Sequence, residues 1–176
     1  MEFEKQSPSQ FEEKWQEIID ASRRGDYELV DEKLVPELAE NIESEKEVLF
    51  LFDRISEIIE PDWVVRDAAV AALNIDSVME KVDALDMRNE LNARMQMALI
   101  GDSFPWIPAN AMNWLLNYAN LDDTKRQTII ETFINQAETR ANNPEEEFAS
   151  QWAKPVLKEE VSFLFKIPEI KNWLEI

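Results

Sequence analysis

The scarcity of glycine constrains this chain more than any other feature of its sequence. Only Gly25 and Gly101 occur among 176 residues, and neither follows an Asn or an Asp. Tight β-hairpins favour Asn-Gly and Asp-Gly turns because these residues adopt a positive φ easily. A fold rich in antiparallel strands is therefore disfavoured, and we predict an all-α protein.

Start and stop signals divide the chain into helices. Residues 9–12 and 44–47 have the Ser-x-x-Glu spacing of a capping box, and Gly25 follows two arginines at the end of the first helix. Pro36 should kink or divide the second helix. The apolar periodicity predicts nine or ten helices in antiparallel hairpins within a single all-α domain, residues 1–176. The expected helices are 9–24, 26–42, 44–59, 62–73, 77–85, 87–100, 109–118, 123–140, 144–153 and 156–165, with a last turn or two from residue 168.

One segment resembles a known repeat. Residues 62–73 read D-x-x-V-R-x-A-A-x-x-A-L, which is similar to the second helix of a HEAT repeat, and residues 48–59 would supply the first helix. The resemblance implies close helix packing at the alanines, and an Asp and an Arg that link neighbouring units. No second good copy follows at the expected period. Two architectures therefore stay open, a HEAT-like superhelix and an irregular helical bundle.

The composition removes most familiar catalytic groups. The chain has no His and no Cys, so it has no imidazole proton shuttle, thiolate nucleophile or zinc cluster. Catalysis would have to rest on carboxylates, Lys, Tyr or Ser. We therefore expect a non-enzymatic protein without a cofactor.

The charge limits the possible partners. The 37 acidic residues exceed the 18 basic ones, which gives a net charge of −19, and residues 1–60 alone carry 18 acidic and 7 basic residues. Such a surface repels nucleic-acid phosphates and anionic lipids, so we expect neither direct nucleic-acid binding nor membrane binding. The start of the chain lacks a basic segment followed by an apolar one, which favours the cytoplasm. The oligomeric state stays open.

An acidic helix face is the first candidate docking surface. Residues 26–47 hold nine acidic residues, and at 100° per residue five glutamates fall on one half of the helical wheel, opposite the apolar positions. Asp31 falls within the apolar arc. The alternative is a solvated face with no partner. The five residues are Glu28, Glu32, Glu37, Glu40 and Glu43.

An aromatic loop is the second candidate. Phe104 and Trp106 lie in residues 102–108, where two prolines hold the chain extended. Exposed aromatic side chains would anchor a partner, whereas buried ones would fill the core. Both interpretations stay open.

Paired carboxylates give a weaker, metal-binding alternative. Glu57 and Glu60, then Glu80 and Asp83, have the E-x-x-E and E-x-x-D spacing that resembles all-α nucleoside triphosphate pyrophosphohydrolases. On helices, this spacing places each pair on one face, where the oxygens could hold a divalent metal ion.

Three functions follow from these observations. The first is a protein–protein interaction module that binds another protein through an acidic docking surface. The second is an acidic inhibitor, immunity or nucleic-acid-mimic protein that neutralises a basic partner. The third is a carboxylate-only, divalent-metal-dependent nucleotide hydrolase.

Overall fold

The computed structural model describes residues 9–175, and this range contains helices and turns but no strand. The prediction of an all-α fold is confirmed. The elements are α1 (Gln10–Arg24), α2 (Tyr27–Leu29), the π-helical turn η1 (Val30–Leu34), α3 (Val35–Glu40), α4 (Glu45–Arg54), α5 (Trp63–Leu73), α6 (Asp76–Ala84), α7 (Arg88–Gly101), α8 (Trp106–Tyr118), α9 (Asp123–Ala141), α10 (Lys154–Glu160), the 3₁₀ helix η2 (Ser162–Lys166) and α11 (Pro168–Glu175).

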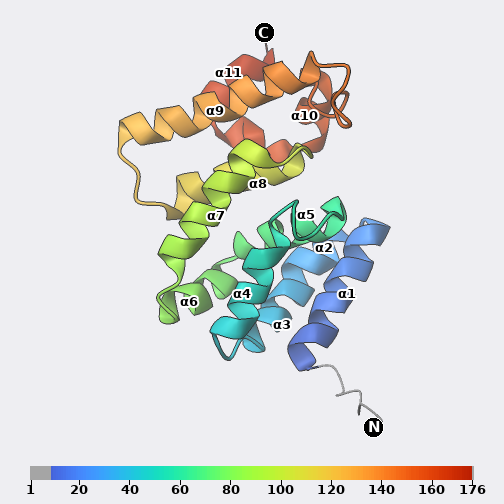
Figure 1. Cartoon of the computed structure of the whole chain (residues 1–176), viewed down its shortest axis with the longest axis vertical. Coiled ribbons are helices and arrows are strands. Elements are labelled where there is room, and N and C mark those ends of the chain that lie inside the picture. The colour runs from blue at the N-terminus through green and yellow to red at the C-terminus, as the bar shows by residue number, and fades with distance from the viewer. Residues whose placement is uncertain (1–8, 176) are drawn as a thin grey trace.

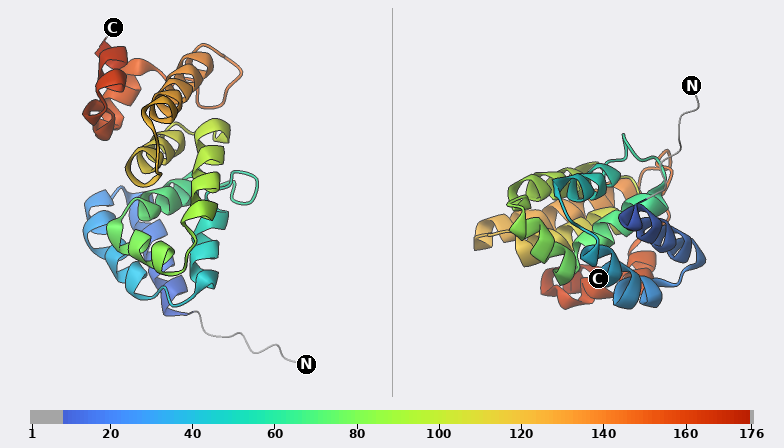
Figure 2. Two further views of the ribbon diagram at one scale, coloured as in Figure 1. Left: turned by 90° about the vertical axis from the view of Figure 1, so that its left-hand side faces the viewer. Right: turned by 90° about the horizontal axis from the view of Figure 1, so that it is seen from below.

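The helices are stacked along the longest axis of the molecule (Figures 1 and 2). Helices α1 to α6 form one end, α9 to α11 form the other, and α8 lies between them. Helix α5 is the centre of the first part, since it packs against α1, α4, α6 and α8. Its Ala68, Ala69 and Ala72 are buried, and these small side chains allow the neighbouring helices to approach.

The predicted capping signals operate as expected at the first helix. The Glu12 N–H donates to Ser9 Oγ at 3.2 Å, and the Ser9 N–H donates to the Glu12 carboxylate at 2.8 Å. Gly25 ends the helix with a φ of 77°, a conformation that side chains with a Cβ adopt with strain. Residues 44–47 form the second predicted capping box.

Pro36 changes the helix type instead of dividing the helix. A proline has no N–H and its ring clashes with the carbonyl four residues earlier. The chain widens into η1 directly before it, and the Val35 N–H donates to the carbonyl of Val30, five residues back. Helix α3 then continues, so the segment from α2 to α3 stays helical throughout.

Several predicted helix bounds are wrong. The predicted helix 144–153 is replaced by turns, in which the Glu146 carboxylate accepts from Arg140 at 3.0 Å and the Asn143 side chain accepts from the Glu145 N–H. The predicted helix 156–165 is interrupted at Val161, between α10 and η2. Helix α8 begins at Trp106, three residues earlier than expected. Pro108 lies in its first turn, where the missing N–H has no helical partner to lose.

Candidate functional site

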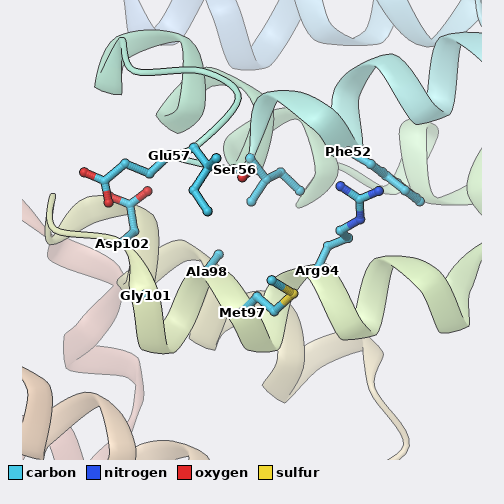
Figure 3. Close-up of a pocket in the computed structure, with 10 residues that line it drawn as sticks. Phe52, Ser56, Glu57, Arg94, Met97, Ala98, Gly101 and Asp102 are labelled. Atoms are coloured by element: carbon cyan, nitrogen blue, oxygen red, sulfur yellow. The ribbon is translucent and has the colours of Figure 1, made fainter.

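A groove lies between α7 and the segment that follows α4. We call residues 55–61 the strap; it runs alongside α7 and leaves a hollow of about 250 Å³ (Figure 3). We call this hollow the groove. Its lining residues are Phe52, Ile55, Ser56, Glu57, Ile58, Arg94, Met97, Ala98, Gly101 and Asp102.

The strap exists because α4 stops early. The sequence predicts a helix to residue 59, yet α4 ends at Arg54, where the N–H of Ile55 already donates to Phe52 O in a tightened last turn. Pro61 disfavours helical geometry at the residue before it. The predicted helix 44–59 is therefore wrong beyond Arg54. On the strap Ile55 is buried, whereas Ile58 is 94% exposed and Ile59 is 52% exposed.

A buried arginine holds the strap in place. Arg66 of α5 donates through Nη1 to the carbonyls of Glu60 and Pro61, at 3.0 and 2.9 Å. The same guanidinium donates to both carboxylate oxygens of Asp102, at 2.7 and 3.1 Å, and both side chains are almost completely buried. Arg66 thus connects the strap to the turn between α7 and α8, which are the two sides of the groove.

Asp102 is also held from the turn itself. The Phe104 N–H donates to its Oδ1 at 2.9 Å. Burial raises the pKa of the Asp102 carboxyl, and the hydrogen bonds from Arg66 and from this N–H oppose the rise. A bidentate guanidinium–carboxylate contact fixes the relative orientation of both groups, so the groove has a defined shape before any partner arrives.

The groove has an apolar floor and an apolar rim. Phe52, Ile55 and Ala98 are buried at its base. On the rim, Met97 of α7 is 69% exposed and Ile58 of the strap is the other exposed apolar residue of the lining. Ile100 is 57% exposed on α7 but does not line the groove. Exposed apolar side chains that meet at one hollow make it a candidate interaction surface.

Three charged residues line the groove, two acidic (Glu57 and Asp102) and one basic (Arg94). The two charges that are nearly buried or already paired are satisfied, since Asp102 pairs with Arg66 at 2.7 Å and Arg94 lies 3.3 Å from both Asp53 and Glu90. Glu57 is the more exposed carboxylate of the lining.

Glu57 is the carboxylate that points along the strap toward Asp102 (Figure 3). Its Oε1 accepts from Ser103 Oγ at 2.7 Å and lies 3.7 Å from Arg66, while its side chain stays 43% exposed. Arg94 lies at the opposite end of the groove, beside Phe52. The groove is therefore negative at one end, apolar in the middle and charge-paired at the other end.

The predicted acidic face is largely at the surface. Glu28, Glu32, Glu40 and Glu43 are exposed, and within residues 9–175 none of them forms an ion pair. Glu37 differs, because Lys14 of α1 lies 2.8 Å from its carboxylate and lowers the pKa of that group. We use the name acidic face for these five glutamates.

A wide, open hollow of about 600 Å³ adjoins the acidic face. It is lined by residues 25–29 with Glu32 and Lys33. Tyr27 is 53% exposed there and Leu29 is 39% exposed, so this surface also offers apolar area to a partner. No buried ion pair fixes its shape within the part of the chain that the structure describes, since its Asp26 pairs with the exposed Arg24.

Three titratable groups lie where α2 and η1 meet α5. Asp67 accepts a hydrogen bond from Asn110 of α8 at 3.2 Å, and burial raises the pKa of its carboxyl to about 6. The negative charge of Asp31 adds to that rise, and burial raises the pKa of Asp31 as well. Burial raises the pKa of Tyr27 too, with further contributions from the charges of Asp67 and Glu160. Asp31 falls within the predicted apolar arc, yet the residue is exposed and only partly desolvated.

The aromatic loop belongs to the core. Phe104 is only 6% exposed; its ring stacks on Trp63 at 4.0 Å and on the half-buried Trp106 at 4.9 Å, and Phe148 meets it edge-on. The Trp152 indole N–H also donates to the Ser103 carbonyl at 2.7 Å. Phe104 as a partner anchor is therefore a wrong prediction, and its neighbour Trp106 is engaged in the same stack.

The four predicted metal-binding carboxylates do not come together. Glu57 and Glu60 lie on the strap instead of on one helix face, because α4 ends before them. Glu80 is exposed on α6, and Asp83 is held by both nitrogens of the Arg88 fork. In the described range, no group of three or more acidic, His or Cys side chains is placed to hold a metal ion.

The exposure of Met97 and Ile100 was not predicted, although the helical periodicity of the sequence indicates it. The buried residues of α7 are Leu91, Met95, Ala98 and Leu99. At 100° per residue, Ile100 falls on the opposite side of the helix from Leu91, so an aliphatic residue there is expected to face water or a partner.

A scan against models of protein families and searches of curated proteins and of solved structures found no match to this chain. Within residues 9–175, no helix combines the length and apolar character that crossing a bilayer requires.

Proposed function

We propose that this protein is a non-enzymatic interaction module that binds another protein in the groove. The observation that carries this proposal is the exposure of Ile58 and Met97 in the lining of a hollow that has a defined shape. Burying one such side chain against a partner contributes about 1.5–3 kcal/mol, so the two together supply a substantial part of a binding energy.

The hydrogen bonds of Arg66 support the proposal. Because Arg66 fixes both sides of the groove, a partner does not have to order the strap when it binds. Binding to a preorganised surface loses less affinity to conformational entropy.

The test is a parallel affinity capture with three forms of the protein. The groove variant carries Ile58→Ser and Met97→Ser, and the control variant carries Tyr27→Ser and Leu29→Ser, which remove exposed apolar area beside the acidic face. We expect the wild type and the control to capture the same partner and the groove variant to lose it, with all three melting at similar temperatures. Equal capture by the groove variant would exclude the groove as the docking site.

A second candidate is an acidic inhibitor, immunity or nucleic-acid-mimic protein that neutralises a basic partner. The observation that favours it is the exposure of Glu28, Glu32, Glu40 and Glu43 without ion pairs in the described range. Association driven by such charges weakens steeply with salt, whereas an apolar interface resists salt. Elution of the captured partner across a salt gradient separates the two functions.

We further assign the protein to the cytoplasm and the chain to a HEAT-type helical architecture. The second assignment is supported by Arg66, which links two consecutive helix pairs as the resemblance of residues 62–73 implies. Asp62 of the same motif caps α5 and pairs with Arg23 of α1 at 2.9 Å.

A further inference from the structure

We propose that the occupant of the groove is a cationic amphipathic helix of a partner protein. The helix inserts an aliphatic side chain between Ile58 and Met97 and places a Lys or an Arg against Glu57. This inference rests on the proposed function and names the chemistry of the partner.

The size of the groove fits a side chain better than a free ligand. Its volume of about 250 Å³ lies below the roughly 300–1,000 Å³ of pockets that enclose a small molecule. Its exposed rim residues also project outward into solvent, where only a larger partner can cover them.

Helix α7 leaves room for the backbone of a helix. Arg94, Met97, Ala98 and Gly101 recur at i, i+3, i+4 and i+7, which is one face of α7, and all four line the groove. Ala98 is small, and a Cβ added to Gly101 would meet no atom within 4 Å. A partner helix can therefore approach the C-terminal turn of α7 closely.

A helix is also the mode of docking that this surface offers. A partner strand binds by adding to an exposed sheet edge, and residues 9–175 contain no strand. A helix needs an apolar groove with anchor positions, which the strap and α7 supply.

The charges around the groove select a basic partner. Arg54, Arg66 and Arg94 are each paired with a carboxylate, while Glu57 keeps a half-exposed carboxylate at the groove end. An acidic helix would meet the exposed carboxylate of Glu57 at close range. A second copy of this chain would bring a net charge of −19 to the same interface, so a partner of opposite charge is favoured.

The experiment titrates three synthetic peptides into the intact protein by calorimetry, at about 0.15 M salt to screen long-range attraction. Two are helical and carry leucines at i, i+3, i+4 and i+7; one has Lys and the other Glu at the remaining positions. The third is the Lys peptide interrupted by a proline. The protein forms are the wild type, Gly101→Leu, Glu57→Gln and the control Leu29→Ser. Gly101→Leu fills open space with a good helix former, so it blocks the groove without a loss of melting temperature.

We expect the Lys peptide to bind the wild type and Leu29→Ser alike, and to bind Gly101→Leu at least about tenfold more weakly. Glu57→Gln should weaken binding by a smaller factor, and the Glu peptide should not bind measurably.

Three results would overturn the proposal. Equal binding of the Lys peptide to wild type and Gly101→Leu would show attraction to the acidic surface in general. Equal binding of the Glu peptide would remove the selection by charge, and equal binding of a proline-interrupted Lys peptide would remove the requirement for a helix. If groove variants lose their natural partner while these peptides fail, the partner chemistry is wrong and the proposed function stands.

Discussion

The groove and the acidic face both expose apolar side chains, but only the groove has a rigid frame. Arg66 joins four oxygen atoms of the strap and the α7–α8 turn through hydrogen bonds of 2.7 to 3.1 Å. The hollow beside the acidic face is open, and the two glutamates that line it, Glu28 and Glu32, form no ion pair within residues 9–175. The difference suggests two roles, with affinity residing in the groove and electrostatic attraction in the acidic face.

Each surface has a proline in its segment: Pro36 lies in α3, within the acidic face segment, and Pro61 is the last residue of the strap. Before Pro36 the helix widens by one π-helical turn and continues, which keeps the acidic residues on a helix. Before Pro61 the helix ends at Arg54, and the released strap exposes Ile58. The helix continues through Pro36, whereas the chain has left the helix well before Pro61, and Arg66 binds the carbonyls of Glu60 and Pro61 there.

The largest expected effect is on the frame of the groove. Arg66→Ala leaves Asp102 buried without its cation, and breaking a buried pair in this way costs about 3–5 kcal/mol. Urea unfolding measures the loss. Arg23→Ala is the control, because its pair with Asp62 is exposed and such pairs contribute about 0–1 kcal/mol. Similar losses for both variants would contradict a frame that depends on Arg66.

Trp106→Ala sharpens the assignment of the aromatic loop to the core. Truncating a buried aromatic residue to Ala lowers the free energy of unfolding by about 3–5 kcal/mol. We expect a loss of about 2 kcal/mol here, because Trp106 is half-buried and stacks on Phe104 from one side. The partner captured through the groove should still bind the folded variant. Lost capture with unchanged stability would make the loop an anchor instead.

The pH dependence of stability distinguishes Asp67, which accepts from Asn110, from Asp102, which is paired with Arg66. The folded state raises the pKa of Asp67 to about 6, so folding favours the protonated carboxyl. The contribution of Asp67 to the free energy of unfolding has its full value below the unfolded pKa of about 3.9. It declines as the pH rises and is lost above about 6. Asp67→Asn should therefore stabilise the protein on the order of 1 kcal/mol at pH 7.5 and little near pH 4. Thermal unfolding at both pH values tests this, and a gain that does not change with pH would contradict it.

Charge reversal on the acidic face has the smallest expected effect on stability. Replacing Glu32, Glu40 and Glu43 by Lys should change the free energy of unfolding by less than about 0.5 kcal/mol per site, because these side chains are exposed and unpaired in the described range. Stopped-flow association with the captured partner should slow at low salt, with dissociation unchanged. Faster dissociation would show that the acidic face, and not only the groove, supplies affinity for the partner.

The sequence predicts the local structure better than the surfaces. Capping boxes at Ser9 and Ser44 and the glycine at residue 25 act through neighbours in the chain, so their effects are readable from spacing alone. The groove depends on contacts between distant residues, above all Arg66 with Asp102, which are 36 positions apart. Periodicity places Ile58 on the predicted helix 44–59, because it cannot show that Arg66 of another helix binds the carbonyls at the end of the strap.

The most direct test of the groove as the docking site is an NMR titration of the protein with ¹³C-labelled methionine methyl groups, using the captured partner. Met97 is exposed in the groove, whereas Met79, Met95 and Met112 are buried in the core. We predict that the Met97 resonance shifts in proportion to the bound fraction while the other three move little. Saturated binding with an unmoved Met97 resonance would contradict the account.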